Sequence, residues 1–417
     1  MQTDSVDTST AELERLIRSG LIDTHFAPVV DRFTGEPAGY TLQHLEHGSE
    51  DGTGSASARL RADIRASQLI GDFDASLRSI GLRAAEAAGL PTHTRLFLQA
   101  EPESLVTVED RTDEPDRSVI LQLHPERIAA SPAAVLRSVR LARSQGWGIG
   151  MEEIGVDLAT AAFLPLVNPS VVTLHPGVLD ITDTAHLAEL IRLLHAHTER
   201  TGGVIMATGV RHEDDLEMVR ALGVRFVTGP LYGGPSTAPE PLTNPPEDPL
   251  ADHFSRNAAV QGTPFSATRA LRRDPLVMDE PLLTAQMQSL QRRALASGGE
   301  SSVVIGVFGE DQELITATRE NFSVLSGSAG FVAALSGGFE EPPIPGVRSG
   351  MVDASDPLRR EYAIIVVGSD WSAMVAASRR SDPGPDGRVE YDVYVTSERY
   401  TCVDAARGVL SRIRPLG

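Results

Sequence analysis

The feature that most constrains the fold is a regular alternation of short apolar segments with amphipathic segments over residues 1–237. The apolar segments have the length of strands, and the amphipathic ones carry apolar residues at helical spacing. Strands that alternate with helices form a parallel sheet, and about 250 residues is a typical length for a closed barrel of this kind. We therefore predict an α/β fold with a (β/α)8 TIM-like barrel. The expected strands are residues 24–30, 95–100, 118–123, 148–151, 171–174, 204–207 and 225–227, with helices such as 134–144, 185–198 and 214–222.

The alternation stops in a proline-rich, acidic stretch over residues 238–262, which contains the run "APEPLTNPPEDPLADHF". Such a composition has neither helical nor strand periodicity and is typical of a linker. Residues 263–417 resume the alternation and predict a second, smaller α/β domain. Its expected helices are 281–296, 312–325, 371–379 and a last one that ends near 413; its expected strands are 302–308, 330–335, 362–367 and 389–396, with a loop over 336–350.

Charge and composition exclude several classes of function. The net charge of -20 argues against binding to nucleic acid or to an anionic membrane surface, because both need basic patches. No long apolar run is present, so we expect a soluble, cytoplasmic protein. The chain has no lysine, which excludes a Schiff base to pyridoxal phosphate or retinal. Every histidine lies at or before His253, so a histidine-ligated haem in the second domain is also excluded.

Polar residues follow the predicted barrel strands, where the chemistry of such barrels takes place. The run "GMEEIG" places two adjacent carboxylates, Glu152 and Glu153, at one of these ends. His124, Glu152 and His175 would lie on three strand tips, and two histidines with one carboxylate can ligate iron or zinc. Neutral polar residues that fill an inactive pocket are the alternative. The strand-end residues, as we call them below, are Thr41, Gln99, Gln122, Glu152, Glu153, Thr173, His175, Thr208 and Thr228.

Three segments resemble the EAL domain, a barrel that hydrolyses cyclic di-GMP with two divalent metals: "FAPVVDRFTGEPAGYTL", "GWGIGMEEIG" and "MATGVRHEDDLEMVRALGVRFVTGPLYGGP". The resemblance covers roughly residues 10–235. It implies that the family's catalytic and metal-binding positions fall on the strand-end residues, where only Glu152 and Glu153 keep a carboxylate. The arginine that the family uses to grip the nucleotide is absent from "TLQHLEHG". We therefore expect hydrolysis to be lost and the barrel to act as a scaffold or to bind partner proteins. The resemblance also implies a homodimer, which is common among such barrels.

The second domain resembles the DICT sensory domain in three segments: "VVIGVFGEDQELITATRENFSVLSGSAGFVAAL", "DPLRREYAIIVVGSDWSAMVAASR" and "RVEYDVYVTSERYTCVDAARGVL". The resemblance implies a sensor, with a response to light among the roles proposed for the family. No cofactor is certain; flavin, bilin and cobalamin stay open as chromophores.

The residues of the second domain offer one candidate ligand site. Its aromatic side chains would form an apolar pocket, with Arg359, Arg360 or a further arginine to hold a carboxylate or phosphate. The alternative is that the aromatic residues are ordinary core. Cys402 near the start of the last helix would have a lowered pKa and could attach a bilin, unless it is buried and inert. The candidates are Phe308, Arg319, Phe322, Phe331, Trp371, Tyr391 and Cys402.

These observations predict a non-catalytic signalling protein in which a degenerate EAL-like barrel is coupled to a DICT-like sensor, with other signalling proteins and a small molecule as its partners. The alternative is a divergent metal-dependent hydrolase or oxygenase that uses His124, Glu152 and His175.

Overall fold

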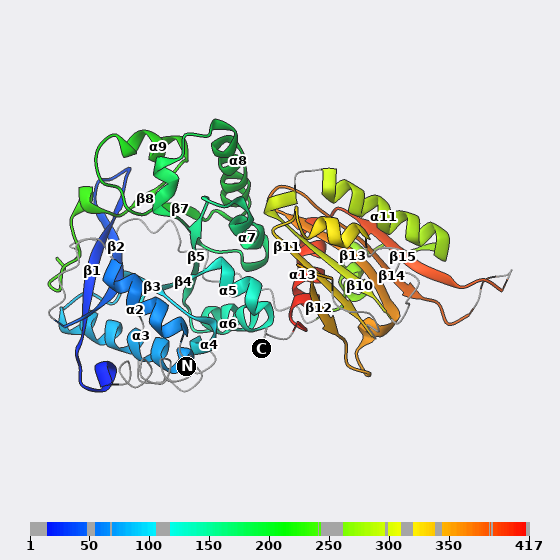
Figure 1. The fold of residues 1–417 in the computed structure, drawn as a ribbon, viewed down its shortest axis with the longest axis horizontal. Helices are drawn as coiled ribbons and strands as arrows, with labels where there is room; N and C mark the ends of the chain where they lie inside the picture. Colours follow the sequence, from blue (N-terminus) through cyan, green and yellow to red (C-terminus); the bar gives the residue numbers. More distant parts are fainter. Residues whose placement is uncertain are drawn as a thin grey trace. The chain divides into compact units, whose positions relative to one another are not determined.

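The computed structural model describes residues 15–47, 55–66, 69–105, 117–240, 242, 262–296, 299–309, 320–337, 344–382, 384 and 387–413. The chain divides into two compact units (Figure 1). The first contains residues 1–127, 137–156 and 169–257, and the second contains residues 128–136, 157–168 and 258–417. This division falls within the predicted linker, of which only residues 238–240, 242 and 262 are described. The linker itself therefore stays a prediction.

Eight strands of the first unit close into a barrel, which confirms the predicted fold class. Neighbouring strands pair in chain order, and β8 pairs with β1 to complete the circle. Most strands start or end within three residues of the expected positions. The strands are β1 (Ile22–Asp31), β2 (Pro37–Glu46), β3 (Arg95–Gln99), β4 (Val119–Leu123), β5 (Gly148–Ile154), β6 (Val171–Leu174), β7 (Val204–Ala207) and β8 (Phe226–Val227).

The barrel differs from a uniformly parallel one at its first strand. β1 is antiparallel to both β2 and β8, whereas β2 to β8 are parallel to one another. Residues 32–36 join β1 to β2, and Gly35 in this turn has a φ of 72°. A crossover between parallel strands needs about a dozen residues or more. The link between β1 and β2 is much shorter, and it can therefore only form a hairpin. The expectation of a fully parallel barrel was wrong for this reason.

Apolar side chains fill the interior of the barrel. A buried cluster takes Val29, Phe97, Ile120, Phe226 and others from seven of the strands. The rings of Phe97 and Phe226 lie 6.4 Å apart although β3 and β8 are not neighbours, so they meet across the interior. Below the strand ends the barrel is therefore a packed core and not a channel.

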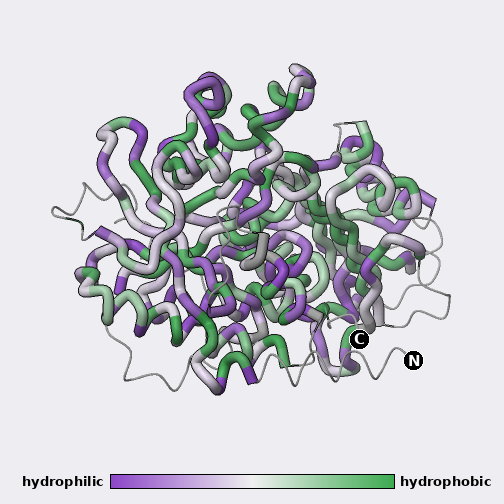
Figure 2. Tube along the Cα trace, turned by 60° about the vertical axis from the view of Figure 1, so that its left-hand side comes forward, coloured by the Kyte–Doolittle hydropathy of each residue, from purple (hydrophilic) through white to green (hydrophobic). Residues whose placement is uncertain are grey.

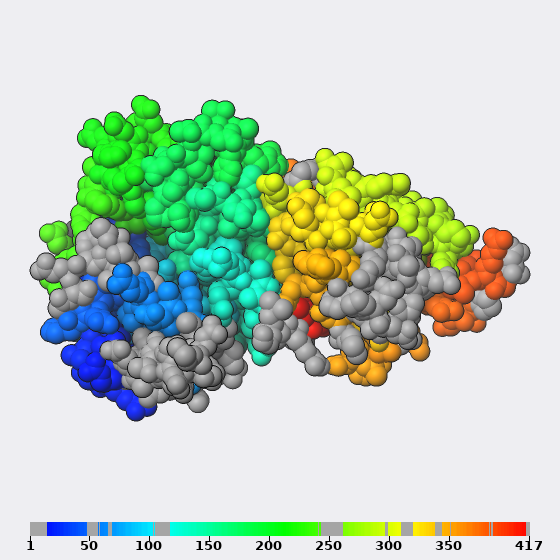
Figure 3. All heavy atoms as spheres, in the orientation of Figure 1, coloured from blue at the N-terminus to red at the C-terminus, as the bar shows by residue number. Residues whose placement is uncertain are grey.

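Amphipathic helices cover the outside of the barrel (Figure 1). Asp183 caps the start of α8 by accepting from two backbone N–H groups, and Gly202 ends it with a φ of 71°. Figure 2 shows hydrophilic and hydrophobic positions together on the helices, and Figure 3 shows atoms of the segment that contains α8 and α9, in green, at the surface. The longer helices are α2 (Ser55–Ala66), α3 (Ile70–Ala87), α6 (Pro132–Ser144), α8 (Thr184–Thr201) and α9 (Asp215–Ala221); α4 (Pro102–Leu105) and α5 (Pro125–Ala130) are short.

The second unit is built on a seven-stranded sheet with the order β12-β11-β10-β13-β14-β15-β9. β10, β11 and β12 run parallel, and the other neighbours are antiparallel. Side chains of α11 (Glu280–Ala296) pack on one face, and α13 (Arg399–Leu410) also contacts β13 and β14. The strands are β9 (Leu276–Asp279), β10 (Ser302–Phe308), β11 (Phe331–Ser336), β12 (Arg348–Met351), β13 (Glu361–Gly368), β14 (Ser372–Arg379) and β15 (Glu390–Thr396).

Three expectations for this unit need correction. Residues 371–379 were predicted to be a helix, but Ser372–Arg379 is the strand β14, which pairs with β13 and β15 on its two sides. Its alanines favour a helix in isolation, and the pairing on both sides overrides that preference. The strand β12 occupies the end of the predicted loop 336–350, and β9 was not expected. Of the predicted helix 312–325, residues 320–325 are helical and residues 312–319 lie outside the described residues.

No helix in the described part of the chain combines the length and the apolar character needed to cross a membrane.

Candidate functional site

The strand-end residues lie at one end of the barrel, because β2 to β8 are parallel. Gln99 ends β3, Gln122 lies in β4, Glu152 and Glu153 lie in β5, and Thr173 lies in β6. Two hydrogen bonds connect these side chains in pairs, from β3 to β5 and from β4 to β6, each across one intervening strand. We call this end of the barrel the mouth.

Glu152 is the buried acid of the mouth, with 7% of its surface exposed. Its Oε2 accepts a hydrogen bond of 2.9 Å from Nε2 of Gln99, and its Oε1 lies 3.9 Å from Nη2 of Arg65. Burial, the largest cause, together with the neighbouring Glu153 raises the pKa of Glu152 to about 7, although the Gln99 hydrogen bond, Arg65 and Arg61 act in the opposite direction. Glu152 can therefore hold or release a proton near neutral pH.

Gln122 occupies the middle of the mouth. Its Nε2 donates a hydrogen bond of 2.8 Å to Oγ1 of Thr173, and both side chains are buried. Its Oε1 has no hydrogen-bond partner among the described residues. A Cβ on Gly150 would lie 2.1 Å from this oxygen, so glycine is required at position 150 if Gln122 keeps its place. A neutral amide thus spans β4, β5 and β6.

Glu153 lies in a different environment from Glu152. Its backbone has a φ of 60°, and the pairing of β5 with β6 shifts register at this point. Oε2 of Glu153 lies 3.3 Å from Nε2 of His175, and both side chains are more than a third exposed. Nδ1 of His175 accepts a hydrogen bond from the N–H of Gly177, so Nε2 carries the proton. The left-handed residue therefore turns one acid of the pair toward solvent.

The other predicted residues at this end do not take part in the two hydrogen bonds between strand-end side chains. Nδ1 of His124 accepts from the N–H of Glu126, and burial lowers the pKa of His124. Oγ1 of Thr208 donates to the carbonyl of Leu174. Thr41 and Thr228 contribute hydroxyls, and Oγ1 of Thr41 is buried without a hydrogen-bond partner in the described part of the chain.

The structure does not assemble the predicted metal set of His124, Glu152 and His175. Within the described ranges, no three side chains of the types His, Cys, Asp and Glu are placed so that they could hold one metal ion. Nδ1 of His175 is engaged by a backbone N–H group and its Nε2 faces Glu153. The metal set stays a prediction without geometric support.

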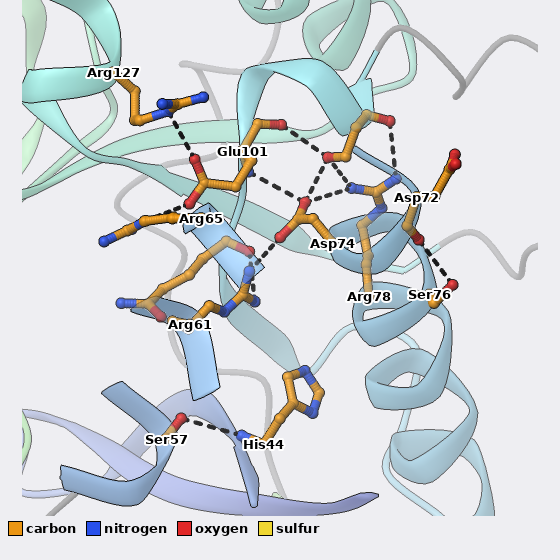
Figure 4. Close-up of polar contacts among 12 residues, drawn as sticks. His44, Ser57, Arg61, Arg65, Asp72, Asp74, Ser76, Arg78, Glu101 and Arg127 are labelled. Carbon is orange, nitrogen blue, oxygen red and sulfur yellow. Dashed lines mark hydrogen bonds and ion pairs between the residues drawn. The ribbon is translucent and has the colours of Figure 1, made fainter. Parts of the chain in front are cut away.

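A network of buried arginines and acids beside the mouth was not predicted from the sequence (Figure 4). Asp74 of α3 is fully buried between Arg61 of α2 and Arg78 of its own helix. Arg61 pairs with one carboxylate oxygen of Asp74, and its other guanidinium nitrogen donates to the carbonyl of Gln99 at 3.2 Å. Nη1 of Arg78 lies 3.5 Å from Asp74 and donates to Oγ of Ser104 at 3.0 Å. The network thus joins two helices to the end of β3.

Two further arginines meet at Glu101, just after β3 (Figure 4). Nε of Arg65 donates to Oε1 of Glu101 at 2.6 Å, and Nε of Arg127 lies 3.0 Å from Oε2. Glu101 is 1% exposed, whereas the Arg65 and Arg127 side chains are 32% and 25% exposed. Helices α2 and α5 therefore bring two arginines to the mouth, although "TLQHLEHG" in β2 has none. The spacing of four between Arg61 and Arg65 on one helix face was the signal in the sequence.

The aromatic candidates of the second unit lie in its core. The rings of Phe308 and Phe322 are 5.5 Å apart, and Tyr391 lies 5.4 Å from Tyr362 in the same buried cluster. Phe331 is also buried, and Trp371 packs against the cluster with its ring 5.0 Å from Cζ of Arg293. Arg319 lies outside the described residues. These contacts agree with the alternative that the aromatic residues are ordinary core.

Cys402 agrees with the alternative of a buried, inert thiol and not with a reactive one. It is fully buried in α13, and burial raises the pKa of its thiol to about 12. Although the residue lies near the start of the helix, the loss of hydration outweighs any benefit to the thiolate there.

Comparison with known proteins links residues 10–235 to a protein-family model described as the EAL domain. Similar solved structures include the FimX EAL domain of Xanthomonas citri in complex with cyclic di-GMP, at 16% identity over 58% of this chain and 97% of that chain, with a TM-score of 0.46. Klebsiella pneumoniae BlrP1 in complex with manganese and cyclic di-GMP matches at 15% identity over 52% and 56%, with a TM-score of 0.41. An EAL domain protein from Listeria monocytogenes matches at 14% over 54% and 93%, with a TM-score of 0.42. This chain thus spans little more than half of the Klebsiella chain, and no curated protein matches it.

Proposed function

Because the chain belongs to the EAL domain family, we propose that it is a signalling protein of the cyclic di-GMP system whose barrel does not hydrolyse the nucleotide. One observation carries the proposal: two hydrogen bonds, from Gln99 to Glu152 and from Gln122 to Thr173, connect the strand ends where the family would bind its metals. Three of these four side chains are neutral. The mouth is therefore stabilised by its own side chains and offers few anionic ligands.

The residues of the mouth do not fit a pair of divalent cations. Two such ions bring four positive charges, and hard cations of this kind bind through several carboxylate oxygens. Of the strand-end residues named above, only Glu152 and Glu153 carry a carboxylate; Glu152 accepts from Gln99, and Glu153 faces His175. Threonine and glutamine side chains supply no charge at the other positions. We therefore derive no metal-dependent step for this barrel.

Turnover of cyclic di-GMP by the purified full chain with Mg²⁺ or Mn²⁺ tests the proposal. We expect no linear dinucleotide product above the protein-free background, and the same result for a variant with Glu152→Gln and Glu153→Gln. Metal-dependent hydrolysis that this double variant abolishes would overturn the proposal and restore a catalytic role to the acidic pair.

Binding of cyclic di-GMP without hydrolysis is a second candidate, and the arginines at Glu101 favour it. Arg65 and Arg127 are each partly exposed, and both contact the buried carboxylate of Glu101. Guanidinium groups bind phosphate through paired hydrogen bonds. Calorimetric titration with cyclic di-GMP tests this: a variant with Arg65→Gln and Arg127→Gln should bind at least about tenfold more weakly. A control with Arg83→Gln and Arg220→Gln, both exposed, should bind as the parent does. Equal affinity in all three proteins would contradict the role of the two arginines.

For the second unit we propose a sensory role, which rests on the resemblance to the DICT domain. A chromophore and a response to light belong to this proposal, as does coupling to other signalling proteins. The visible absorption spectrum of the purified protein tests the chromophore, since a spectrum with only the aromatic protein band would remove it. Stoichiometric iron, zinc or manganese in the same preparation would instead favour the alternative metal-dependent enzyme.

A further inference from the structure

The seven-stranded sheet of the second unit ends at β9, which pairs with β15 on one side. No strand in the described part of the chain pairs with its other side. Such an edge presents unpaired backbone N–H and C=O groups, which can pair with a strand of another chain. We propose that β9 is an interface at which a second copy of this chain pairs edge to edge, in antiparallel direction. This contact lies in the second unit and is independent of any pairing between barrels.

The backbone groups that face outward can be assigned from the neighbouring strands. In an antiparallel pair, residues that lie opposite each other alternate between pairs with hydrogen bonds and pairs without them. The N–H of Arg380 donates to the carbonyl of Glu390, so the even-numbered residues of β15 bond to β14 and the odd-numbered ones to β9. Met278 lies opposite the odd-numbered Tyr391. Its neighbour Val277 therefore directs its N–H and C=O groups away from the sheet.

Large hydrophobic side chains are exposed around this edge. Leu276 and Val277 of β9 are more than half exposed, and Leu282 in the first turn of α11 is nearly half exposed. Val395 of the neighbouring strand β15 is exposed as well. These four belong to the nine exposed large hydrophobic side chains in the described ranges, so the exposed apolar surface is concentrated here. Burial of such side chains against a partner drives association.

The order of charges along β9 selects the partner. Arg272 and Arg273 precede the strand and are exposed, and Asp274 follows them. Asp279 and Glu280 lie at the other end, so the start has a net charge of +1 (two arginines and one aspartate) and the end one of -2 (two acids). In an antiparallel pair of two copies, the start of each strand lies beside the end of the other, and opposite charges meet at both ends. A second copy of β9 thus carries the charge pattern that complements the first, whereas a parallel pair would bring like charges together.

Contacts at both ends hold β9 in its extended form. Nη2 of Arg273 donates to the carbonyl of Val395 at 2.6 Å, and the hydroxyl of Tyr394 donates to the carbonyl of Arg273 at 2.9 Å. At the other end, Oδ1 of Asp279 accepts from the N–H of Leu282. The partners of both charged side chains are neutral, so Arg273 and Asp279 keep their charges. The edge is therefore formed before a second copy binds, and little conformational entropy is lost on pairing.

Sedimentation velocity of the full chain over about 1 to 100 µM tests the proposal. A four-residue strand makes a small interface, and small interfaces are typical of weak association. We therefore expect a shift from monomer to dimer with a dissociation constant on the order of 10 µM. Val277→Glu puts two like charges at the centre of the pair and should raise this constant at least about tenfold. Val324→Glu is the matched control: Val324 is equally exposed but lies between β10 and β11, away from β9 in the sheet order, and this variant should stay within about twofold of the parent.

An exchange of charges distinguishes pairing through β9 from any other contact. Arg272→Glu and Glu280→Arg should each weaken self-association about fivefold or more, because each brings like charges together at both ends of the pair. A one-to-one mixture of the two single variants should form a heterodimer within about twofold of the parental affinity, since opposite charges then meet at both ends again. The recovery also shows that both variants are folded. A chain that stays monomeric, a dimer that Val277→Glu leaves intact, single charge variants that associate as the parent does, or a mixture that associates no better than its components would each overturn the proposal.

Discussion

The barrel has two buried polar regions that balance charge in opposite ways. In the arginine network beside the mouth, Asp74 is fully buried and two guanidinium groups neutralise it. In the mouth, Glu152 is nearly as buried, but its close partner is the neutral amide of Gln99, and Arg65 is 3.9 Å away. Burial of a charge is costly unless a partner of opposite charge compensates for it. The charges of the network therefore compensate one another, so that removal of one member is costly, whereas the mouth keeps an acid whose charge is poorly compensated.

The largest expected effect comes from breaking the network. Asp74→Asn would leave Arg61 and Arg78 buried without their carboxylate, and the loss of one member of a buried ion pair costs about 3–5 kcal/mol. Urea unfolding measures the change, with Asp72→Asn as the control, since Asp72 is an exposed acid on the same helix. The control should lie within about 0.5 kcal/mol of the parent. A similarly small change for Asp74→Asn would contradict the assignment of Asp74 as the centre of the network.

The acid of the mouth should respond to pH instead. The folded chain holds the proton of Glu152 up to a pKa of about 7, whereas the unfolded chain releases it near 4.5. Between these values the unfolded state binds fewer protons, so the free energy of unfolding falls as the pH rises. A difference of this size corresponds to about 3 kcal/mol.

Glu152→Gln removes this titration. The variant should be more stable relative to the parent at pH 8 than at pH 5, and the difference should develop between about pH 4.5 and 7. Urea unfolding at several pH values measures it. Parallel stability curves for the parent and the variant would show that the proton of Glu152 does not differ between the folded and unfolded states.

A smaller loss of stability is expected at the neutral part of the mouth, where Gly150 packs against Gln122. Gly150→Ala would place a Cβ on the amide of Gln122 and displace it from Thr173. Overpacking of a buried site costs about 1–3 kcal/mol. The combination of Gly150→Ala with Gln122→Ala should recover part of the loss, because the small side chain makes room for the new methyl group. Thermal unfolding measures both, and no recovery in the double variant would place the clash elsewhere.

The smallest effect is expected for the exposed acid of the pair. Glu153 faces His175 with both side chains more than a third exposed, so solvent screens their interaction. Glu153→Gln should change the free energy of unfolding by no more than about 0.5 kcal/mol. A loss comparable to that of Asp74→Asn would remove the distinction between the two regions.

Much of the barrel could be predicted from its sequence, because a strand–helix alternation marks each element locally. β6 and β7 have the expected bounds, and β10 in the second unit does as well. The direction of β1 depends on the length of the following link, and the strand β14 depends on its neighbours in the sheet. The periodicity within a segment contains no information about the direction of β1 or about the neighbours of β14.

The sequence also predicted only part of the candidate site, because it marks strand ends locally but does not show which helices pack beside them. The rule that chemistry follows strand ends located Gln99, Gln122 and Glu152. Arg65 and Asp74 come from helices, and only the folded chain brings α2 and α3 to the end of β3. The environment of an acid also depends on its neighbours in space, so the sequence could not separate Glu152 from Glu153.

The pairing that closes the barrel extends past its last strand. Phe26 of β1 bridges to Ser236, and the hydroxyl of Tyr40 donates to the carbonyl of Glu240 at 2.6 Å. Leu242 is buried as well. The family match ends at residue 235, so a recombinant barrel cut there would lack these contacts with β1 and β2. A recombinant barrel should therefore extend at least to residue 242. The family match ends before the last residues that contact the barrel strands.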